Sequence, residues 1–358
     1  MATPPYSVVD CDGHLIESIP ELAHYLPPSI RSIATAPTRN RQGVFPSLDG
    51  FHYPKPLDRA EVHGHQRVTA SEHRPGSGED WLAFITKANI DHAVLFTTEG
   101  LSVGFLQLES YAVQLCRAYN DYVAERYRGV SDRLHPMALL PLQNATEAAR
   151  ELRRAVVELG LPGAMLPSTG LPLHLGHEYY WPVYEEAARL ECALGVHGGS
   201  NRGIGIDSFT DFTASHILHH PVPLMHALVS FVCHGVLDRY PTLRVAFLEG
   251  GCGWLVCLLD RMARDEEYFP GQAKRRLPDY LASGQLLIGC EGDDPSLAYL
   301  VERVGATPFA YASDYPHEVD LVDAQRQIQT TAERADLSPA AKAAILGANA
   351  RRFFRFGA

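Results

Sequence analysis

Short apolar segments recur along the chain and alternate with segments that have the periodicity of α-helices. Continuous apolar runs of roughly four to eight residues are typical of strands buried on both faces of a parallel sheet. Eight such runs occur, at residues 7–12, 92–97, 134–142, 163–167, 193–197, 244–248, 286–290 and 309–313. Helical periodicity is clearest at residues 107–127, 145–159, 179–190 and 224–239. Strands alternating with helices indicate βαβ units, and eight units favour closure into a (β/α)8 barrel of the TIM type over an open sheet.

The length of 358 residues is large for one ordinary domain but suits a barrel with inserted loops. We therefore expect residues 1–358 to form a single barrel domain. Residues 36–78 are rich in Pro, Gly, His and Arg. They predict an insertion after the first strand, with a small hairpin, lying over the barrel mouth. A second irregular segment, residues 198–223, follows the fifth strand.

Composition excludes several classes of protein. The net charge of −11 and the scattered basic residues argue against a nucleic-acid partner. Seven dispersed cysteines without a CxxC pair are typical of reduced thiols in a cytoplasmic protein. Neither a signal peptide nor an apolar run long enough to cross a membrane is recognisable. We expect a cytoplasmic protein that acts on a small molecule.

Side chains suited to metal binding stand at the ends of several predicted strands, where barrels carry their functional residues. Asp12 and His14 end the first strand and are two residues apart, so both point to one face. His197 ends the fifth strand and Asp314 follows the eighth. Each alone has a simpler interpretation as a turn former, a helix cap or a buried histidine. Together they predict one divalent metal ion, with Zn²⁺ as the first choice and Mn²⁺ or Fe²⁺ as alternatives.

Several motifs give the chain a family resemblance that runs from one end to the other. The matching stretches are residues 10–17, 196–198, 235–241, 247–254, 312–317 and 345–352. On these motifs the chain resembles the amidohydrolase-2 branch of the metal-dependent barrels, which includes aminocarboxymuconate semialdehyde decarboxylase and related aromatic decarboxylases. The resemblance implies the same four metal ligands and points to a homodimer.

Two positions depart from the family pattern. The first strand of better-known members often carries His-x-His or Glu-x-His, whereas Asp12 takes the first place here. Many decarboxylases of the family have a catalytic histidine at the end of strand six, where this chain has Glu249. An alternative, purely structural interpretation of Glu249 is a carboxylate that accepts hydrogen bonds from the backbone amides of the Gly250–Gly251 turn. These departures weaken a direct transfer of the decarboxylase mechanism.

Five side chains are candidates for roles in catalysis or substrate binding. Asp314 is the candidate general base, and Glu249 either protonates a leaving group or orients a neighbouring histidine. His216 is the candidate acid or base that replaces the missing strand-six histidine, against the alternative of a surface-loop residue. Arg202 and His317 are candidates for binding an anionic substrate group.

Three functions compete. The leading hypothesis is hydrolysis of a C–N, C–O or C–C bond next to a carbonyl, by water that the metal activates. The alternative is nonoxidative decarboxylation of an aromatic or unsaturated acid, in which a protein acid protonates carbon. A noncatalytic barrel is the third possibility, and it would not require the polar strand ends to converge.

Overall fold

Eight parallel strands form the centre of the described part of the chain. The computed structural model describes residues 5–34, 44–46, 76–198, 203–269 and 271–356. The strands are β1 (Val9–Leu15), β2 (His92–Thr97), β3 (Leu134–Pro136), β4 (Gly163–Pro167), β5 (Ala193–His197), β6 (Arg244–Leu248), β7 (Leu286–Cys290) and β8 (Phe309–Tyr311). All eight are buried except for half-buried His92 at the start of β2, as expected for strands covered on both faces.

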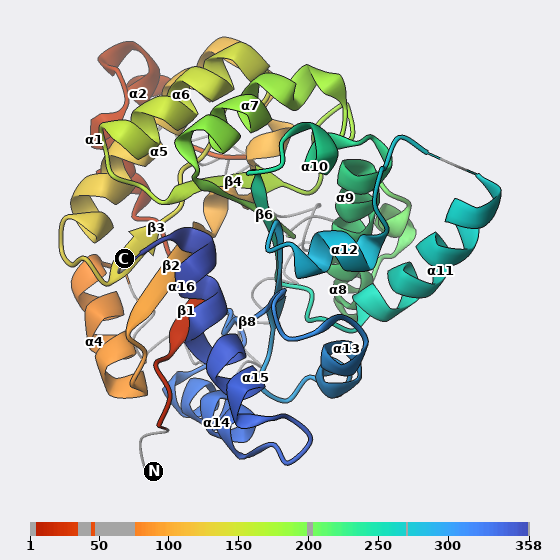
Figure 1. The fold of residues 1–358 in the computed structure, drawn as a ribbon. Coiled ribbons are helices and arrows are strands. Elements are labelled where there is room, and N and C mark those ends of the chain that lie inside the picture. Colours follow the sequence, from red (N-terminus) through yellow and green to blue (C-terminus); the bar gives the residue numbers. More distant parts are fainter. Residues whose placement is uncertain (1–4, 35–43, 47–75, 199–202, 270, 357–358) are drawn as a thin grey trace.

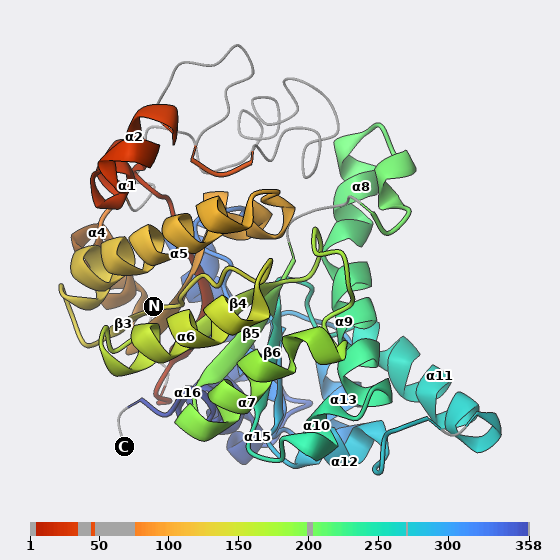
Figure 2. The ribbon, with the colours of Figure 1, turned by 90° about the horizontal axis from the view of Figure 1, so that it is seen from above.

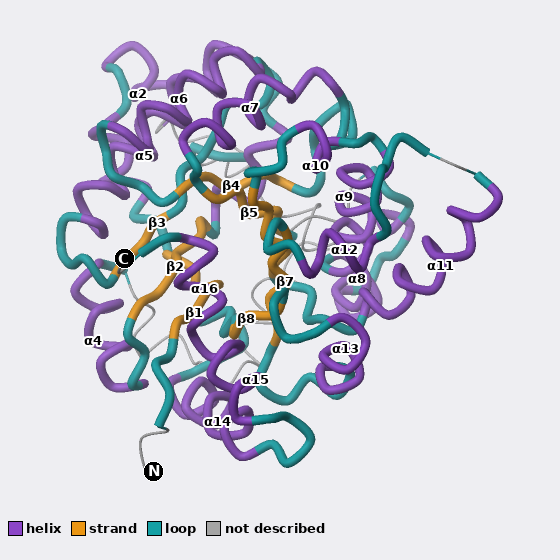
Figure 3. The backbone as a smooth tube through the Cα atoms, viewed as in Figure 1, coloured by secondary structure: helices purple, strands orange, loops and turns teal. Residues whose placement is uncertain are grey.

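The strands close into a ring. Parallel ladders run in the order β1-β2-β3 and β4-β5-β6-β7-β8. A parallel bridge between Ala138 and Ala164 joins the end of the first ladder to β4, and a second between Gly13 and Tyr315 joins the chain after β8 to β1. Figure 3 shows the strands gathered at the centre with helices outside them. The predicted (β/α)8 barrel is confirmed.

Helices cover the outside of the ring (Figures 1 and 2). They are α1 (Ile19–Tyr25), α2 (Pro28–Ala34), α4 (Gly78–Ala88), α5 (Glu109–Val123), α6 (Ala145–Val157), α7 (Trp181–Leu190), α8 (Phe212–His219), α9 (Pro221–Cys233), α10 (Val236–Arg239), α11 (Trp254–Tyr268), α12 (Leu277–Ala282), α13 (Leu297–Val304), α14 (Leu321–Glu333), α15 (Pro339–Ala343) and α16 (Asn349–Phe354). Among the described residues, no helix combines the length and apolar character needed to cross a membrane.

Local signals explain where some helices begin and end. The Asn144 side chain accepts a hydrogen bond from the Glu147 amide and so caps α6. The helix expected over residues 224–239 is divided into α9 and α10, because Gly235 adopts a left-handed conformation with φ 67°. Helix α8 forms inside the segment expected to be irregular, and the Asp211 side chain caps it by accepting from the Ala214 amide. In Figure 2, α8 stands at the same end of the barrel as α1 and α2.

Two segments lie outside the regular alternation of strands and helices. Of residues 36–78, the structure describes only 44–46 and 76–78, so the expected hairpin lies outside the described residues. Val44 and Phe45 are buried, and the Tyr111 hydroxyl donates to the Val44 carbonyl at 2.7 Å. The aromatic C-terminal tail packs on its own barrel, where Phe353 and Phe354 are buried.

Asn120 ties α5 to the chain after β3. Its fully buried amide donates to the Leu139 carbonyl at 3.0 Å and accepts from the Leu139 amide at 2.8 Å. We expect Asn120→Leu to lower the free energy of unfolding by about 2–4 kcal/mol, because both backbone groups lose their partner in the core. Urea denaturation measures this, with Gln114→Ala in the same helix as a control near wild type. An unchanged urea midpoint for Asn120→Leu would show that these bonds contribute nothing.

Candidate metal centre

The structure brings the four predicted metal ligands together at the C-terminal end of the barrel. The Nε2 atom of His197 lies 3.0 Å from Oδ1 of Asp12. The Nε2 atom of His14 lies 3.7 Å from the same oxygen and 3.3 Å from Oδ1 of Asp314. Asp12, His14 and His197 are buried, whereas the Asp314 side chain is 18% exposed. A noncatalytic barrel would not need this convergence.

The chemistry of the donor atoms fits one divalent cation. Nδ1 of His14 donates to the carbonyl of Thr97 at 2.8 Å, so Nε2 carries the lone pair that faces the cluster. Burial lowers the pKa of His14 well below its usual value, which keeps the ring neutral as a metal ligand must be. Within the described residues, His14 Nε2 and Asp12 Oδ2 are buried atoms without a hydrogen-bond partner. Such atoms are costly unless something binds them.

A buried carboxylate supports His14 from behind. Glu17 accepts hydrogen bonds from the Thr97 hydroxyl and from the Glu99 amide, the latter at 3.1 Å. Thr97 in turn provides the carbonyl that orients the His14 ring. Burial raises the pKa of Glu17 to about 7, although the bond from Thr97 lowers it. Glu17 therefore acts on the centre through Thr97 rather than by direct contact.

Asp10 joins the two strand ends that carry most of the ligands. Its carboxylate accepts from the Ser313 amide at 3.0 Å, from the Ser313 hydroxyl at 2.6 Å and from the Asp12 amide at 3.2 Å. Burial raises the pKa of Asp10 to about 7. Asp10 thereby sets the spacing between Asp12 at the end of β1 and Asp314 beyond β8.

Asp314 and His317 form a close pair beside the other ligands. Asp314 adopts a left-handed conformation with φ 59°, and its amide donates to the Asp12 carbonyl at 2.8 Å. Its Oδ1 lies 3.1 Å from Nδ1 of His317. Burial raises the pKa of Asp314 well above its usual value, although the charge of His317 opposes this. Burial lowers the pKa of His317, but Asp314 outweighs it and leaves that pKa well above the ordinary value.

Glu249 lies among histidines. Its Oε2 is 3.1 Å from Nδ1 of His197 and 3.3 Å from Nδ1 of His220, and its Oε1 is 3.6 Å from Nδ1 of His317. Burial raises the pKa of Glu249, but the charges of His220 and His197 lower it well below its usual value. Burial likewise lowers the pKa of His197, and the charges of Asp12 and Glu249 reverse that effect. The geometry favours Glu249 as an ionised carboxylate that orients histidines.

The structure does not place the other two predicted site residues, His216 and Arg202, among the metal ligands. His216 lies on α8 with Nε2 3.5 Å from Oε1 of Glu318, and its ring centroid is 4.9 Å from that of His220. His220, rather than His216, contacts Glu249. The acid–base role of His216 stays a prediction. Arg202 lies outside the described residues. Sequence reasoning missed His220 and Glu318 as neighbours of the site, although Asp211 is a recognisable N-cap and could have indicated a helix that carries His216 and His219.

A cavity of about 840 Å³ opens next to β4 and β5. Its wall includes Ser168 and Thr169, which directly follow β4, together with Phe105 and Leu173. Pro167 at the end of β4 is the register partner of His197, and the Ser168 amide donates to the His197 carbonyl at 3.1 Å. The cavity therefore lies beside the strand that carries His197, a predicted metal ligand, and has a size typical of small-molecule sites.

Comparisons with known proteins show the family of this chain. A sequence model of the family described as Amidohydrolase matches residues 9–356. The chain is 25% identical over 274 residues to 2-amino-3-carboxymuconate-6-semialdehyde decarboxylase of Dictyostelium discoideum, covering 75% of this chain and 74% of that protein.

Solved structures show the same fold. A 2,6-dihydroxybenzoate decarboxylase from Rhizobium superposes with a TM-score of 0.70 at 21% identity, covering 99% of this chain and 100% of that one. A 5-carboxyvanillate decarboxylase from Novosphingobium aromaticivorans, complexed with manganese and 4-hydroxy-3-methoxy-5-nitrobenzoic acid, gives a TM-score of 0.69 at 20% identity, covering 98% and 97%. Because the family model spans nearly the whole chain, this protein is an enzyme of the amidohydrolase family.

Proposed function

We propose that this enzyme catalyses metal-dependent, nonoxidative decarboxylation of an aromatic or other unsaturated carboxylic acid. The observation that carries the proposal is the Asp314–His317 pair, 3.1 Å apart, immediately beside the converged metal ligands. Decarboxylation replaces CO2 by a proton on carbon, so it needs a proton-carrying group next to the site that holds the carboxylate. Relatives named as decarboxylases support this reaction, which the sequence analysis gave as the alternative to hydrolysis.

In this proposal, Asp12, His14, His197 and Asp314 hold one divalent ion. When bound, the ion supplies a Lewis acid that positions the substrate carboxylate and offsets its charge. Both Zn²⁺ and Mn²⁺ are candidates, because two imidazoles and two carboxylates suit either ion. The sequence favours Zn²⁺ and the manganese in a structure of the same fold favours Mn²⁺. Metal analysis of protein purified without chelators decides between them.

The chain's own residues would handle the proton. The pair of Asp314 Oδ1 and His317 Nδ1 holds a proton, which moves to the substrate carbon that carries the carboxylate. A π electron pair of the substrate forms the new C–H bond. The bond from that carbon to the carboxylate then breaks, CO2 leaves, and the electrons of the broken bond restore the double bond. One proton from solvent restores the pair. Glu249 keeps His317 and His197 oriented through its two carboxylate oxygens.

The substrate would enter through the cavity of about 840 Å³ beside β5. Phe105 and Leu173 give it apolar walls, whereas Ser168 and Thr169 offer hydroxyl groups. This combination suits a flat hydrophobic acid with a few polar substituents. We further propose that residues 1–358 form one barrel domain, and that the protein is a homodimer on the strength of the family resemblance.

Product labelling tests the reaction. We expect incubation with a panel of hydroxylated benzoic acids, in D2O and separately in H2¹⁸O, to release CO2 and a product with deuterium at the vacated carbon and no ¹⁸O. The reason is that a proton from solvent, and not water oxygen, enters the product. Asp314→Asn protein serves as the background control. Incorporation of ¹⁸O without release of CO2 would contradict decarboxylation and support the hydrolase hypothesis.

A further inference from the structure

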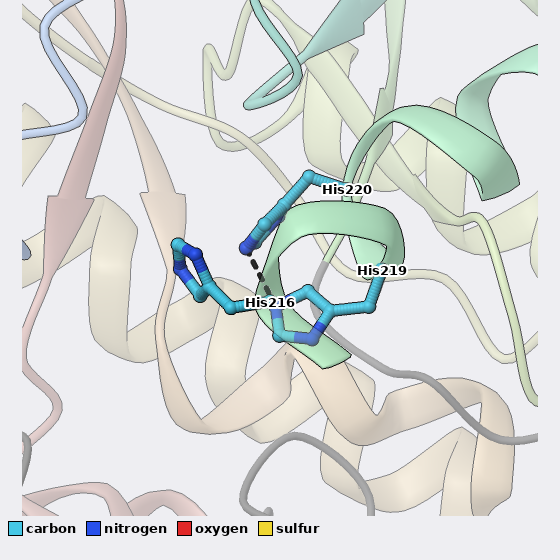
Figure 4. Close-up of side chains that lie close together, drawn as sticks. All are labelled: His216, His219 and His220. Carbon is cyan, nitrogen blue, oxygen red and sulfur yellow. Dashed lines mark hydrogen bonds between the residues drawn. The ribbon is translucent and has the colours of Figure 1, made fainter. Parts of the chain in front are cut away.

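Three histidines gather at the C-terminal end of α8, next to the metal centre but separate from its four ligands. His216, His219 and His220 follow the spacing that puts helical side chains on one face. One nitrogen of each ring lies within 4.8 Å of a nitrogen of the other two. Figure 4 shows the three rings close together, with a dashed line joining His219 to His220. His219 and His220 are buried, and the His216 side chain is 32% exposed.

In each of the two buried rings, one nitrogen faces a polar side chain, as in metal-ligating histidines, whose second nitrogen usually has a polar partner. Nδ1 of His220 lies 3.3 Å from the Glu249 carboxylate, and Nδ1 of His219 lies 3.5 Å from the Ser215 hydroxyl. Their Nε2 atoms face each other at 2.7 Å. The outward nitrogens therefore face polar groups, and the two Nε2 atoms face each other.

A carboxylate stands at the open side of this cluster. Oε1 of Glu318 lies 3.5 Å from Nε2 of His216, and its side chain is 47% exposed. Burial raises the pKa of Glu318, but the bond to His216 and the charge of His317 lower it to about 2. The cluster thus offers three imidazoles and one carboxylate, and the side chains of His216 and Glu318 are partly exposed.

We propose that His216, His219 and His220 bind a second divalent cation, with the Glu318 carboxylate as fourth ligand. Three imidazoles and one carboxylate suit Zn²⁺ in tetrahedral coordination. Nitrogens at the usual Zn–N distance are roughly 3.3 Å apart in that geometry. The observed 2.7 Å between the His219 and His220 Nε2 atoms therefore has to open by a fraction of an ångström, which small ring rotations supply.

This second site does not depend on the reaction proposed above, because it shares no ligand with the first centre. It would pin α8 against the end of β6 through His220 and Glu249. It would also place a second positive charge behind the Glu249 carboxylate. The competing interpretation is a hydrogen-bonded histidine cluster that binds no cation and only positions Glu249.

Zinc titration of the full chain, stripped of metal by dialysis against a chelator, tests the site by calorimetry and by metal analysis after gel filtration. We expect two bound equivalents in the wild type and one in His216→Ala. Asp12→Asn should keep the histidine site alone, and the double variant should bind none. Glu318→Gln should weaken the second event by about tenfold or more. His226→Ala, which removes an exposed histidine of α9, is the matched control and should keep both equivalents.

Cobalt gives an independent readout. In the Asp12→Asn protein, Co²⁺ should produce the visible absorption of tetrahedral coordination, and His216→Ala in the same background should abolish it. Circular dichroism checks that each variant is folded, and the partly exposed Glu318 provides a second variant if His216→Ala folds poorly. A single equivalent in the wild type, or a second equivalent that survives both His216→Ala and Glu318→Gln, would overturn the proposal in favour of the hydrogen-bonded cluster.

Discussion

Asp314→Asn is expected to lower kcat for decarboxylation by about 10³-fold, within the range that a positioned acid or base contributes. Asparagine keeps the shape of the side chain but cannot exchange a proton with Nδ1 of His317, which lies 3.1 Å away. It is also a weaker, neutral ligand beside His14. The rate of CO2 release at saturating substrate measures the effect.

Two further variants separate the roles of Asp314. His317→Gln should lower kcat while the first metal equivalent is retained, because His317 is outside the four ligands. Asp293→Asn, at an exposed acid that follows β7 and bonds to Arg326, should leave kcat near the wild-type value. If Asp314→Asn kept most of the wild-type kcat with unchanged metal content, Asp314 would carry no proton in the reaction and the proposed mechanism would fail.

Loss of the first metal is expected to reduce activity by at least about 10²-fold, since even partners behind metal ligands contribute up to that much. Asp12→Ala should have this effect because it removes the carboxylate that contacts both His14 and His197. Chelated wild-type protein should lose activity to the same extent. Readdition of Zn²⁺ or Mn²⁺ should restore the wild type but not Asp12→Ala, as followed by CO2 release.

The metal experiment also tests whether the two proposed sites differ. Asp12 has no contact with the histidines of α8 among its described partners, so Asp12→Ala should lose one equivalent and keep the other. Circular dichroism shows whether the variant is folded. Full activity in wild-type protein with no measurable bound metal would contradict a metal-dependent reaction. The zinc titration of the same protein would still show separately whether the histidine site binds an ion.

Five strands were predicted residue for residue: β2, β4, β5, β6 and β7. They are short, apolar and bounded by polar or glycine residues, so local composition defines both ends. The run at 134–142 continues beyond β3, which ends at Pro136, because an apolar segment can be buried without strand pairing. Helix α8 was missed since its Thr, Ser and His residues have low helix propensity. The Asp211 cap and the following α9 stabilise it instead.

The sequence by itself determined the barrel and predicted the four candidate ligands, because the alternation of strands and helices decides which residues stand at the C-terminal ends of strands. Only the tertiary structure decided how these groups act on one another. Closure of β1 against the chain after β8, through Gly13 and Tyr315, brings Asp12 and Asp314 together across some 300 residues. It also decides which nitrogen of His14 faces the centre. Such choices depend on distances of a few tenths of an ångström between segments remote in sequence, and no local pattern encodes them.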